Sequence, residues 1–335
     1  MHMADALVSP SVAGVMYACS AVAAGYSIKK VRADIDTRKI PVMGVMGAFV
    51  FATQMINFTI PGTGSSGHLC GGMLLAALLG PFGGFLAMIG VLLVQCLLFA
   101  DGGLLALGSN IWNMAFYGCF IGSLLIWKPI MKNGMSRAKI ITASIIGCVL
   151  TLQLGAFSVT LETLVSGITE LPFGAFVSVM QPIHLAIGFV EGLITATVLL
   201  FVYEARPELL FSGSETDRRE GKFSLRSTLG ILAVAAIVIG GLLSLVASSN
   251  PDGLEWSMEK VAGTAELEAA GDIYASAESV QEATSILPDY ALPGSESAAG
   301  TIISGLVGIV VVVGLCISVC YLFKFFRKKK QYEQN

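Results

Sequence analysis

Three histidines are the side chains of this chain best suited to binding a transition metal, and one of them stands at residue 2. There the amine of Met1, the peptide nitrogen of His2 and its Nδ1 atom follow one another along the chain. Binding of all three to one ion closes fused five- and six-membered chelate rings. A fourth nitrogen in the same plane completes a square, which points to Ni(II) or Cu(II), is less natural for Co(II) and disfavours Zn(II).

His68 is the obvious fourth ligand, because it follows the glycine-rich segment 61–67. Glycine permits the positive φ angles that fold a loop back onto a buried terminus. Irregular backbone at membrane depth is tolerated only where protein buries it or where it lines a cavity. Two plainer interpretations stay open: His2 could be a frayed terminal residue, and His68 could be a loop residue bonded to backbone.

His184 and Glu191 are seven residues apart in one apolar segment, so they share a helix face. An ionisable residue inside a membrane span suggests function. The carboxylate could orient a metal-binding imidazole or hold the loop, and an ordinary interhelical hydrogen bond is an equal alternative. Asn57, beside the loop, and Ser66, within it, are further residues that we expect to surround the ligands.

The composition is that of a membrane protein. Of the 335 residues, 55% are hydrophobic and 13% charged, whereas soluble domains carry about 25% charged residues. The net charge of −3 argues against a nucleic-acid-binding protein. The chain contains neither G-x-x-x-x-G-K-[ST] nor H-E-x-x-H, so P-loop ATP binding and that zinc-protease chemistry are excluded.

Positioning these residues requires helices that cross a bilayer core of about 30 Å, each with about 20 mostly apolar residues. The segment 69–79 is short, but we count it as a separate span because the cluster at 80–84 contains Gly and Pro and predicts a turn. The other apolar windows are 8–28, 41–58, 85–100, 109–127, 140–160, 183–203, 228–247 and 301–323. The fold class is therefore all-α and polytopic, with about nine transmembrane helices.

The basic residues indicate the orientation. All of the 20 lysines and arginines except Lys260 fall in four clusters, at 29–39, 128–139, 206–226 and 324–330. Nine spans place all four clusters on one face, as the positive-inside rule requires, whereas merging 69–100 into one span would divide them. We expect the N-terminus outside and the C-terminus in the cytoplasm. The first 28 residues lack Lys and Arg, so we expect no cleaved signal peptide.

The chain divides into two predicted modules. Residues 1–205 form a seven-span module, 206–226 a polar cytoplasmic linker, and 227–335 a two-span module. Between the last two spans lies an extracytoplasmic segment, 248–300, which is rich in acids and contains Lys260 as its single base. We expect this acidic segment to be loosely ordered.

Several runs of the chain resemble a known family. Residues 1–10 resemble the start M-H-[IM]-x-[DE]-[GA]-x-[LIV]-S-P of the CbiM/NikM family, the substrate-capture components of energy-coupling-factor transporters for cobalt and nickel. Further similar runs follow in order, at 66–69, 79–81, 98–103, 108–110, 184–188 and 191–192. The run Pro-Asp-Gly-Leu-Glu-Trp at 251–256 resembles the PDGLE-type N component that is often fused to this family.

The resemblance implies a metal held by the Met1 amine, the peptide nitrogen and imidazole of His2, and His68. Nickel and cobalt members share these ligands, and nickel is slightly favoured here. It also implies a protein of the prokaryotic cytoplasmic membrane that is not an enzyme and binds no cofactor, with a transmembrane coupling subunit and separate ATPases as partners. The acids of 248–300 are assigned no role at the metal.

Two other functions remain open at this stage. A proton-coupled secondary carrier could use His184 and Glu191 as a proton relay, and energising by a pH gradient without ATPase partners would indicate it. A sensory or scaffold protein could bind another protein through its acidic external segment, and saturable metal uptake would exclude that role.

Overall fold

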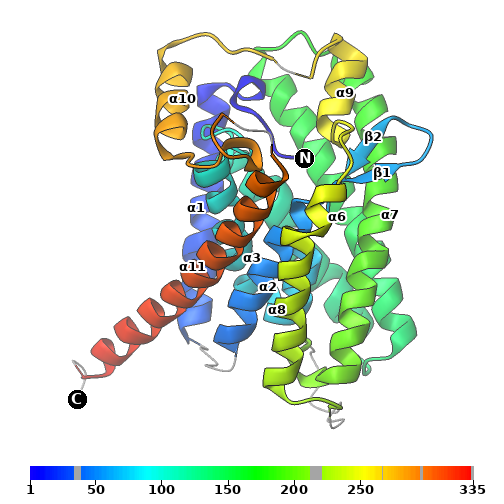
Figure 1. Ribbon diagram of the computed structural model, residues 1–335, viewed down its shortest axis with the longest axis vertical. Helices are drawn as coiled ribbons and strands as arrows, with labels where there is room; N and C mark the ends of the chain where they lie inside the picture. The colour runs from blue at the N-terminus through cyan, green and yellow to red at the C-terminus, as the bar shows by residue number, and fades with distance from the viewer. Residues whose placement is uncertain (34–38, 212–220, 266, 295–296, 333–335) are drawn as a thin grey trace.

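The computed structural model describes residues 1–33, 39–211, 221–265, 267–294 and 297–332, with side chains up to residue 322. Within these residues, six helices are long and apolar enough to cross a membrane, and two shorter helices are also apolar. The six are α1 (Pro10–Ala33), α3 (Gly72–Phe99), Leu107–Met131, α6 (Arg137–Ser166), α7 (Phe173–Ala205) and α11 (Ala298–Tyr332), and the shorter two are α2 (Lys39–Gln54) and α8 (Leu225–Gly241). The protein is a multi-pass helical membrane protein (Figure 1).

The helix Leu107–Met131 is continuous but changes its winding. It begins as α4 (Leu107–Asn110), is π-helical through η2 (Ile111–Trp127) and ends as α5 (Lys128–Met131). Gly118 of η2 leaves no space for a side chain, since a Cβ atom there would lie 2.8 Å from the Cα of Gly72. The first turn of α3 therefore packs directly on the backbone of η2.

Residues 72–99 form a helical hairpin, although they are assigned to one element. Gly80 has φ 75° and ψ 172°, which is not helical, and Pro81 follows it. A Cβ atom on Gly84 would lie 2.9 Å from the nitrogen of Ala76, so the second limb turns back on the first. The turn predicted for 80–84 is present. The number of membrane crossings stays a prediction.

The described residues of the first three basic clusters lie at one end of the molecule. Glu204, at the end of α7, forms ion pairs with Arg137 and Lys222, each at 2.7 Å. A cavity of about 310 Å³ is lined by lysines from the first two clusters, Lys30, Lys39 and Lys128. Arg38, Arg218 and Arg219 lie outside the described residues, as does the middle of the predicted linker, 212–220. The shared end agrees with the predicted topology, and the side of the membrane remains a prediction.

The two long apolar helices of the second module, α8 and α11, pack against α2 and against each other, with small residues at the contacts. A Cβ atom on Gly47 of α2 would lie 3.2 Å from Cys316 Sγ of α11, and one on Gly305 would meet the carbonyl oxygen of Gly240 at 2.1 Å. Small residues let helix backbones approach closely where the hydrophobic effect gives little drive for association.

The acidic segment 248–300 is folded where it is described, so the expectation of loose order is wrong. It contains α9 (Gly253–Ala262), α10 (Asp272–Thr284) and the 3-10 turn η5 (Pro288–Tyr290), which follow the short turn η4 (Leu243–Val246). Its apolar residues Leu254 and Met258 are buried. We predicted disorder from the composition alone, which does not show that these apolar residues recur on one face of a helix. Figure 1 shows α9 and α10 at the end of the molecule opposite to the C-terminus.

One short β-hairpin interrupts the helical fold and was not predicted. Strand β1 (Phe58–Ile60) pairs antiparallel with β2 (Ser65–Gly67). The connecting turn contains Gly62 and Gly64, with φ angles of 77° and 78°, so two of the three glycines of 61–67 adopt the expected positive φ. The hairpin leads directly into His68.

Candidate metal centre

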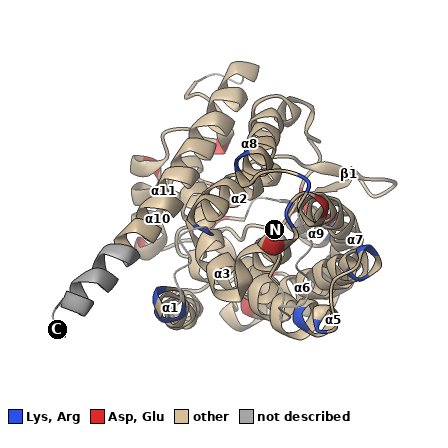
Figure 2. Ribbon diagram, turned by 90° about the horizontal axis from the view of Figure 1, so that it is seen from below, with Lys and Arg blue, Asp and Glu red and all other residues tan. Residues whose placement is uncertain are grey.

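The first three residues are buried or half-buried and hydrogen-bonded rather than frayed. Met1 is 4% exposed and Met3 is fully buried. The side chain of Asn110 accepts from Met3 N at 2.7 Å and donates to Met3 O at 3.1 Å, and Gly103 N also donates to that oxygen. Seen from below, the N-terminus lies among α2, α3, α6, α7 and α9 (Figure 2). The start of the chain is thus held in the middle of the helix bundle.

The terminal amine lies between His68 and Asp252. The Met1 nitrogen is 2.9 Å from His68 Nε2 and forms an ion pair with Asp252. The other ring nitrogen of His68, Nδ1, is 3.1 Å from the carbonyl oxygen of Leu69, to which it can donate. That bond leaves the lone pair of Nε2 directed at the amine, which is the form of imidazole that binds metals.

The imidazole of His2 lies beside that of His68 but faces other partners. The two rings stack with centroids 5.3 Å apart. His2 Nδ1 is 3.2 Å from Asp101 Oδ1, and His2 Nε2 is 3.2 Å from Gln95 Oε1. The structure therefore brings together Met1, His2 and His68, but the Nδ1 atom needed for the chelate is directed at Asp101. Chelation requires this ring to turn.

The electrostatics of the site keep the imidazoles neutral. Burial, together with the adjacent amine and His2, holds the pKa of His68 well below its usual range. Burial also lowers the pKa of His2, against the opposing effect of Asp101. Burial works against the charge of Asp252, yet the amine and His68 hold the pKa of this carboxyl below its usual range. The site at neutral pH thus contains neutral imidazoles and an ionised carboxylate.

His184 and Glu191 support the site from α7 at two separate points. Glu191 Oε1 accepts from Gly71 N at 2.9 Å, so the carboxylate holds the chain three residues after His68. His184 Nδ1 donates to Met180 O of its own helix at 2.8 Å. Its ring packs against Gly253 of α9, where a Cβ atom would lie 3.1 Å from Nε2. Within the described chain we find no hydrogen bond between His184 and Glu191.

Ser66 and Asn57 tie the β-hairpin to the second module and make no contact with the amine. Ser66 N donates to Pro251 O at 2.8 Å, and its hydroxyl donates to Asn250 O at 2.8 Å. The backbone oxygen of Asn57 accepts from Ser248 N at 2.7 Å. Both residues therefore position the chain just before Asp252.

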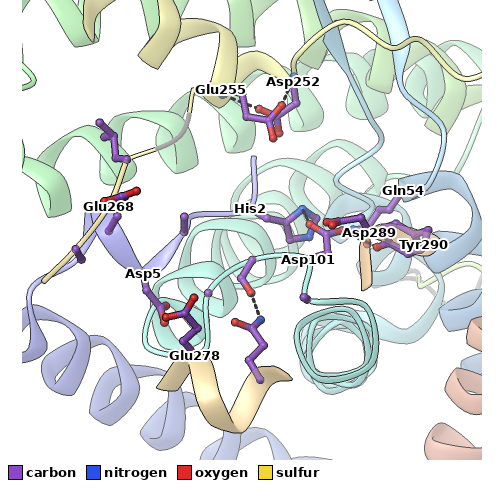
Figure 3. Close-up of a pocket in the computed structure, with 18 of the residues that line it drawn as sticks. His2, Asp5, Gln54, Asp101, Asp252, Glu255, Glu268, Glu278, Asp289 and Tyr290 are labelled. Carbon is purple, nitrogen blue, oxygen red and sulfur yellow. Dashed lines mark hydrogen bonds and ion pairs between the residues drawn. The ribbon is translucent and has the colours of Figure 1, made fainter. Parts of the chain in front are cut away.

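Two cavities meet at these residues. A space of about 10 Å³, roughly the size of one water, is bordered by Met1, His68, His184 and Asp252 among others. A larger cavity of about 840 Å³ also reaches His2 and His68 and opens outward. Figure 3 shows acidic side chains around this larger cavity, and its lining includes Asp5, Asp101, Asp252, Glu255, Glu268, Glu278 and Asp289. No lysine or arginine among the described residues lines it.

Comparison with known proteins decides the family. The family model described as the cobalt uptake substrate-specific transmembrane region, CbiM, matches residues 2–209. The chain belongs to the CbiM family. A PDGLE domain matches residues 226–325.

Relatives of similar length carry both parts of this CbiM chain. The chain is 36% identical over 322 residues to a putative fused nickel transport protein NikMN of Archaeoglobus fulgidus, covering 94% of this chain and 96% of that one. It is 28% identical to the fused nickel transport protein NikMN of Rhodobacter capsulatus, covering 93% and 95%. A crystal structure of a truncated transition metal transporter matches with a TM-score of 0.54 at 30% identity, covering 61% of this chain and 99% of that one.

Two carboxylates at the candidate site were missed by sequence reasoning. Asp101 contacts His2, and Asp252 contacts the amine, whereas the acids of 248–300 had been assigned no role at the metal. Both lie in runs that carried the family resemblance, 98–103 and 251–256, so a signal was present. What the sequence lacked was any indication that residue 252 lies beside residue 1.

Proposed function

We propose that this CbiM-family protein captures Ni(II) or Co(II) at an extracytoplasmic site formed by the Met1 amine, His2 and His68. One observation carries this proposal: the Met1 nitrogen and His68 Nε2 are 2.9 Å apart. With metal–nitrogen bonds of about 2.0–2.1 Å, neighbouring corners of a square are about 2.9 Å apart. The peptide nitrogen and Nδ1 of His2 supply the other two corners once its ring turns from Asp101.

Metal binding at this site exchanges protons for the ion. A bound amine and a bound peptide nitrogen must each lose one proton, so about two protons leave when one divalent ion enters. The ammonium carries one positive charge, and a divalent ion beside one deprotonated peptide nitrogen carries the same net charge. The buried site therefore accepts the ion without gaining charge, which limits the desolvation cost.

Delivery to the cytoplasm depends on other proteins in this proposal. The chain lacks a P-loop motif, so ATP hydrolysis belongs to separate ATPases joined through a transmembrane coupling subunit of an energy-coupling-factor transporter. The protein itself acts in transport and catalyses no reaction. It resides in the prokaryotic cytoplasmic membrane, with the metal as substrate rather than cofactor.

The direct test compares His68→Ala with His184→Ala in the full-length protein, measuring Ni(II) affinity by titration calorimetry. Changing residues around a metal ligand costs about 10- to 100-fold in affinity, so loss of a ligand in His68→Ala should cost more than His184→Ala. If His184→Ala lowers the Ni(II) affinity more than His68→Ala does, the metal site lies elsewhere.

The proton-coupled carrier is tested by Glu191→Gln. The glutamine oxygen can still accept from Gly71 N, so our proposal expects Ni(II) binding and uptake to stay within about 10-fold of the wild type. A proton relay cannot run through glutamine. Loss of uptake with Ni(II) binding intact would favour the carrier.

A further inference from the structure

We infer that Asp252 of the PDGLE domain completes the capture site, because its carboxylate holds the Met1 amine beside His68. This inference rests on the proposed function and adds a positioning residue from the second module. Asp252 Oδ2 contacts the amine and lies 3.8 Å from His68 Nε2. The two ligands that must become neighbours in the metal complex are therefore both within reach of one carboxylate oxygen.

Because the Met1 amine is buried, it needs the carboxylate of Asp252 as its counter-charge. Met1 is 4% exposed and the Asp252 side chain 13% exposed. The hydrogen-bond partners of the amine among the described residues are His68 and Asp252. An ammonium group left in such a site without its counter-charge is costly, so without Asp252 the amine would be drawn toward the water of the outer cavity and away from His68.

Asp252 is rigidly mounted, so it can act as a positioning group. Its other oxygen, Oδ1, accepts from Leu254 N at 2.7 Å and Glu255 N at 2.9 Å, which caps the start of α9. Glu255 in turn accepts from Asp252 N at 3.0 Å. One oxygen is thus fixed by the helix, and the other is presented to the amine.

Helix α9 is itself fixed on the first module. Trp256 Nε1 donates to Thr63 O at 3.1 Å. Gly253 fits against α7 with no space for a side chain, since a Cβ atom there would lie 2.7 Å from Ile187 Cδ1. The position of Asp252 is therefore set by the same β-hairpin and helix that position His68.

The contact can persist through metal capture. The ammonium, and the divalent ion with its deprotonated peptide nitrogen, present the same net positive charge to Asp252. The carboxylate can therefore hold the empty site in a nearly bound arrangement and then balance the charge of the bound ion, without leaving its place on α9.

The test uses three variants of the full-length protein with authentic Met1: Asp252→Asn, Asp252→Ala and Glu255→Gln. Asparagine caps a helix about as well as aspartate does, so Asp252→Asn removes the charge and keeps the cap. Glu255→Gln is the matched control, because it removes a neighbouring carboxylate charge while its amide oxygen can still accept from Asp252 N. We expect Ni(II) affinity to fall by about 10- to 100-fold in both Asp252 variants and to change by less than about twofold in Glu255→Gln.

A second experiment measures whether Ni(II) binding at the first module stabilises helix α9 of the second. Because coupling is reciprocal, Ni(II) should slow hydrogen exchange at residues 253–262 in the wild type, and this protection should be lost in Asp252→Asn. Wild-type affinity in Asp252→Asn overturns the inference, as does an equal loss in Glu255→Gln. If His68→Ala also binds like the wild type, the proposed function fails as well, so the two failures are distinguishable.

Discussion

At the residue scale, the burial of the histidines determines how metal binding depends on pH. Burial, the amine and His2 hold the pKa of His68 well below its usual range, and burial lowers the pKa of His2. An ordinary histidine, with a pKa of about 6.5, takes up a proton as the pH falls below that value. With its pKa lowered, His68 stays neutral at pH values where an ordinary histidine takes up a proton, so acid competes less for this ligand.

This leads to a prediction about proton release. The protons released per Ni(II) ion, from the amine and the peptide nitrogen, should be about two at pH 7 and should rise less at lower pH than they would with two ordinary imidazoles in the site, while the affinity rises with pH. Calorimetry in buffers of different ionisation enthalpy measures this number. A count that climbs toward about four as the pH falls would show that both imidazoles are protonated in the empty site.

At the scale of elements, the hairpin of α3 depends on Gly80. Its φ is +75°, and a Cβ atom there would lie 3.1 Å from Phe211 Cδ2, so alanine at this position is strained and crowded. Gly80→Ala should lower stability by more than about 1 kcal/mol, seen as a lower Tm. Gly14→Ala in α1 is the matched control, because a Cβ atom there meets nothing within 4 Å. Equal Tm values for the two variants would contradict this role for Gly80.

The elements also show which parts of the site could be predicted. Met1, His2 and His68 could be identified because their chemistry is local: adjacent atoms form the chelate, and a glycine-rich turn precedes His68. The turn at Gly80 is local in the same way. Helix α9 and the contact of Asp252 with Met1 could not be foreseen, because they depend on packing between distant segments. The orientation of His2 likewise depends on Asp101 and Gln95.

At the scale of the whole molecule, the two modules form one structure, with the described residues of the first three basic clusters at one end and the candidate metal site toward the other. We predict that the end bearing Glu204 and Lys222 is cytoplasmic and that α9 is outside. An alkaline phosphatase reporter, which is active only outside the cytoplasm, should be active when fused after residue 265 and inactive when fused after residue 222. The reverse pattern would contradict the predicted orientation.

The central claim is that the amine of Met1 binds the metal, and one added residue tests it most directly. A protein with an alanine ahead of Met1 keeps every side chain but replaces the amine beside His68 by a peptide nitrogen. With Tm measured to verify folding, we predict that the extended protein loses tight Ni(II) binding while authentic Met1 protein retains it. Equal affinity in the two proteins would contradict the terminal-amine site.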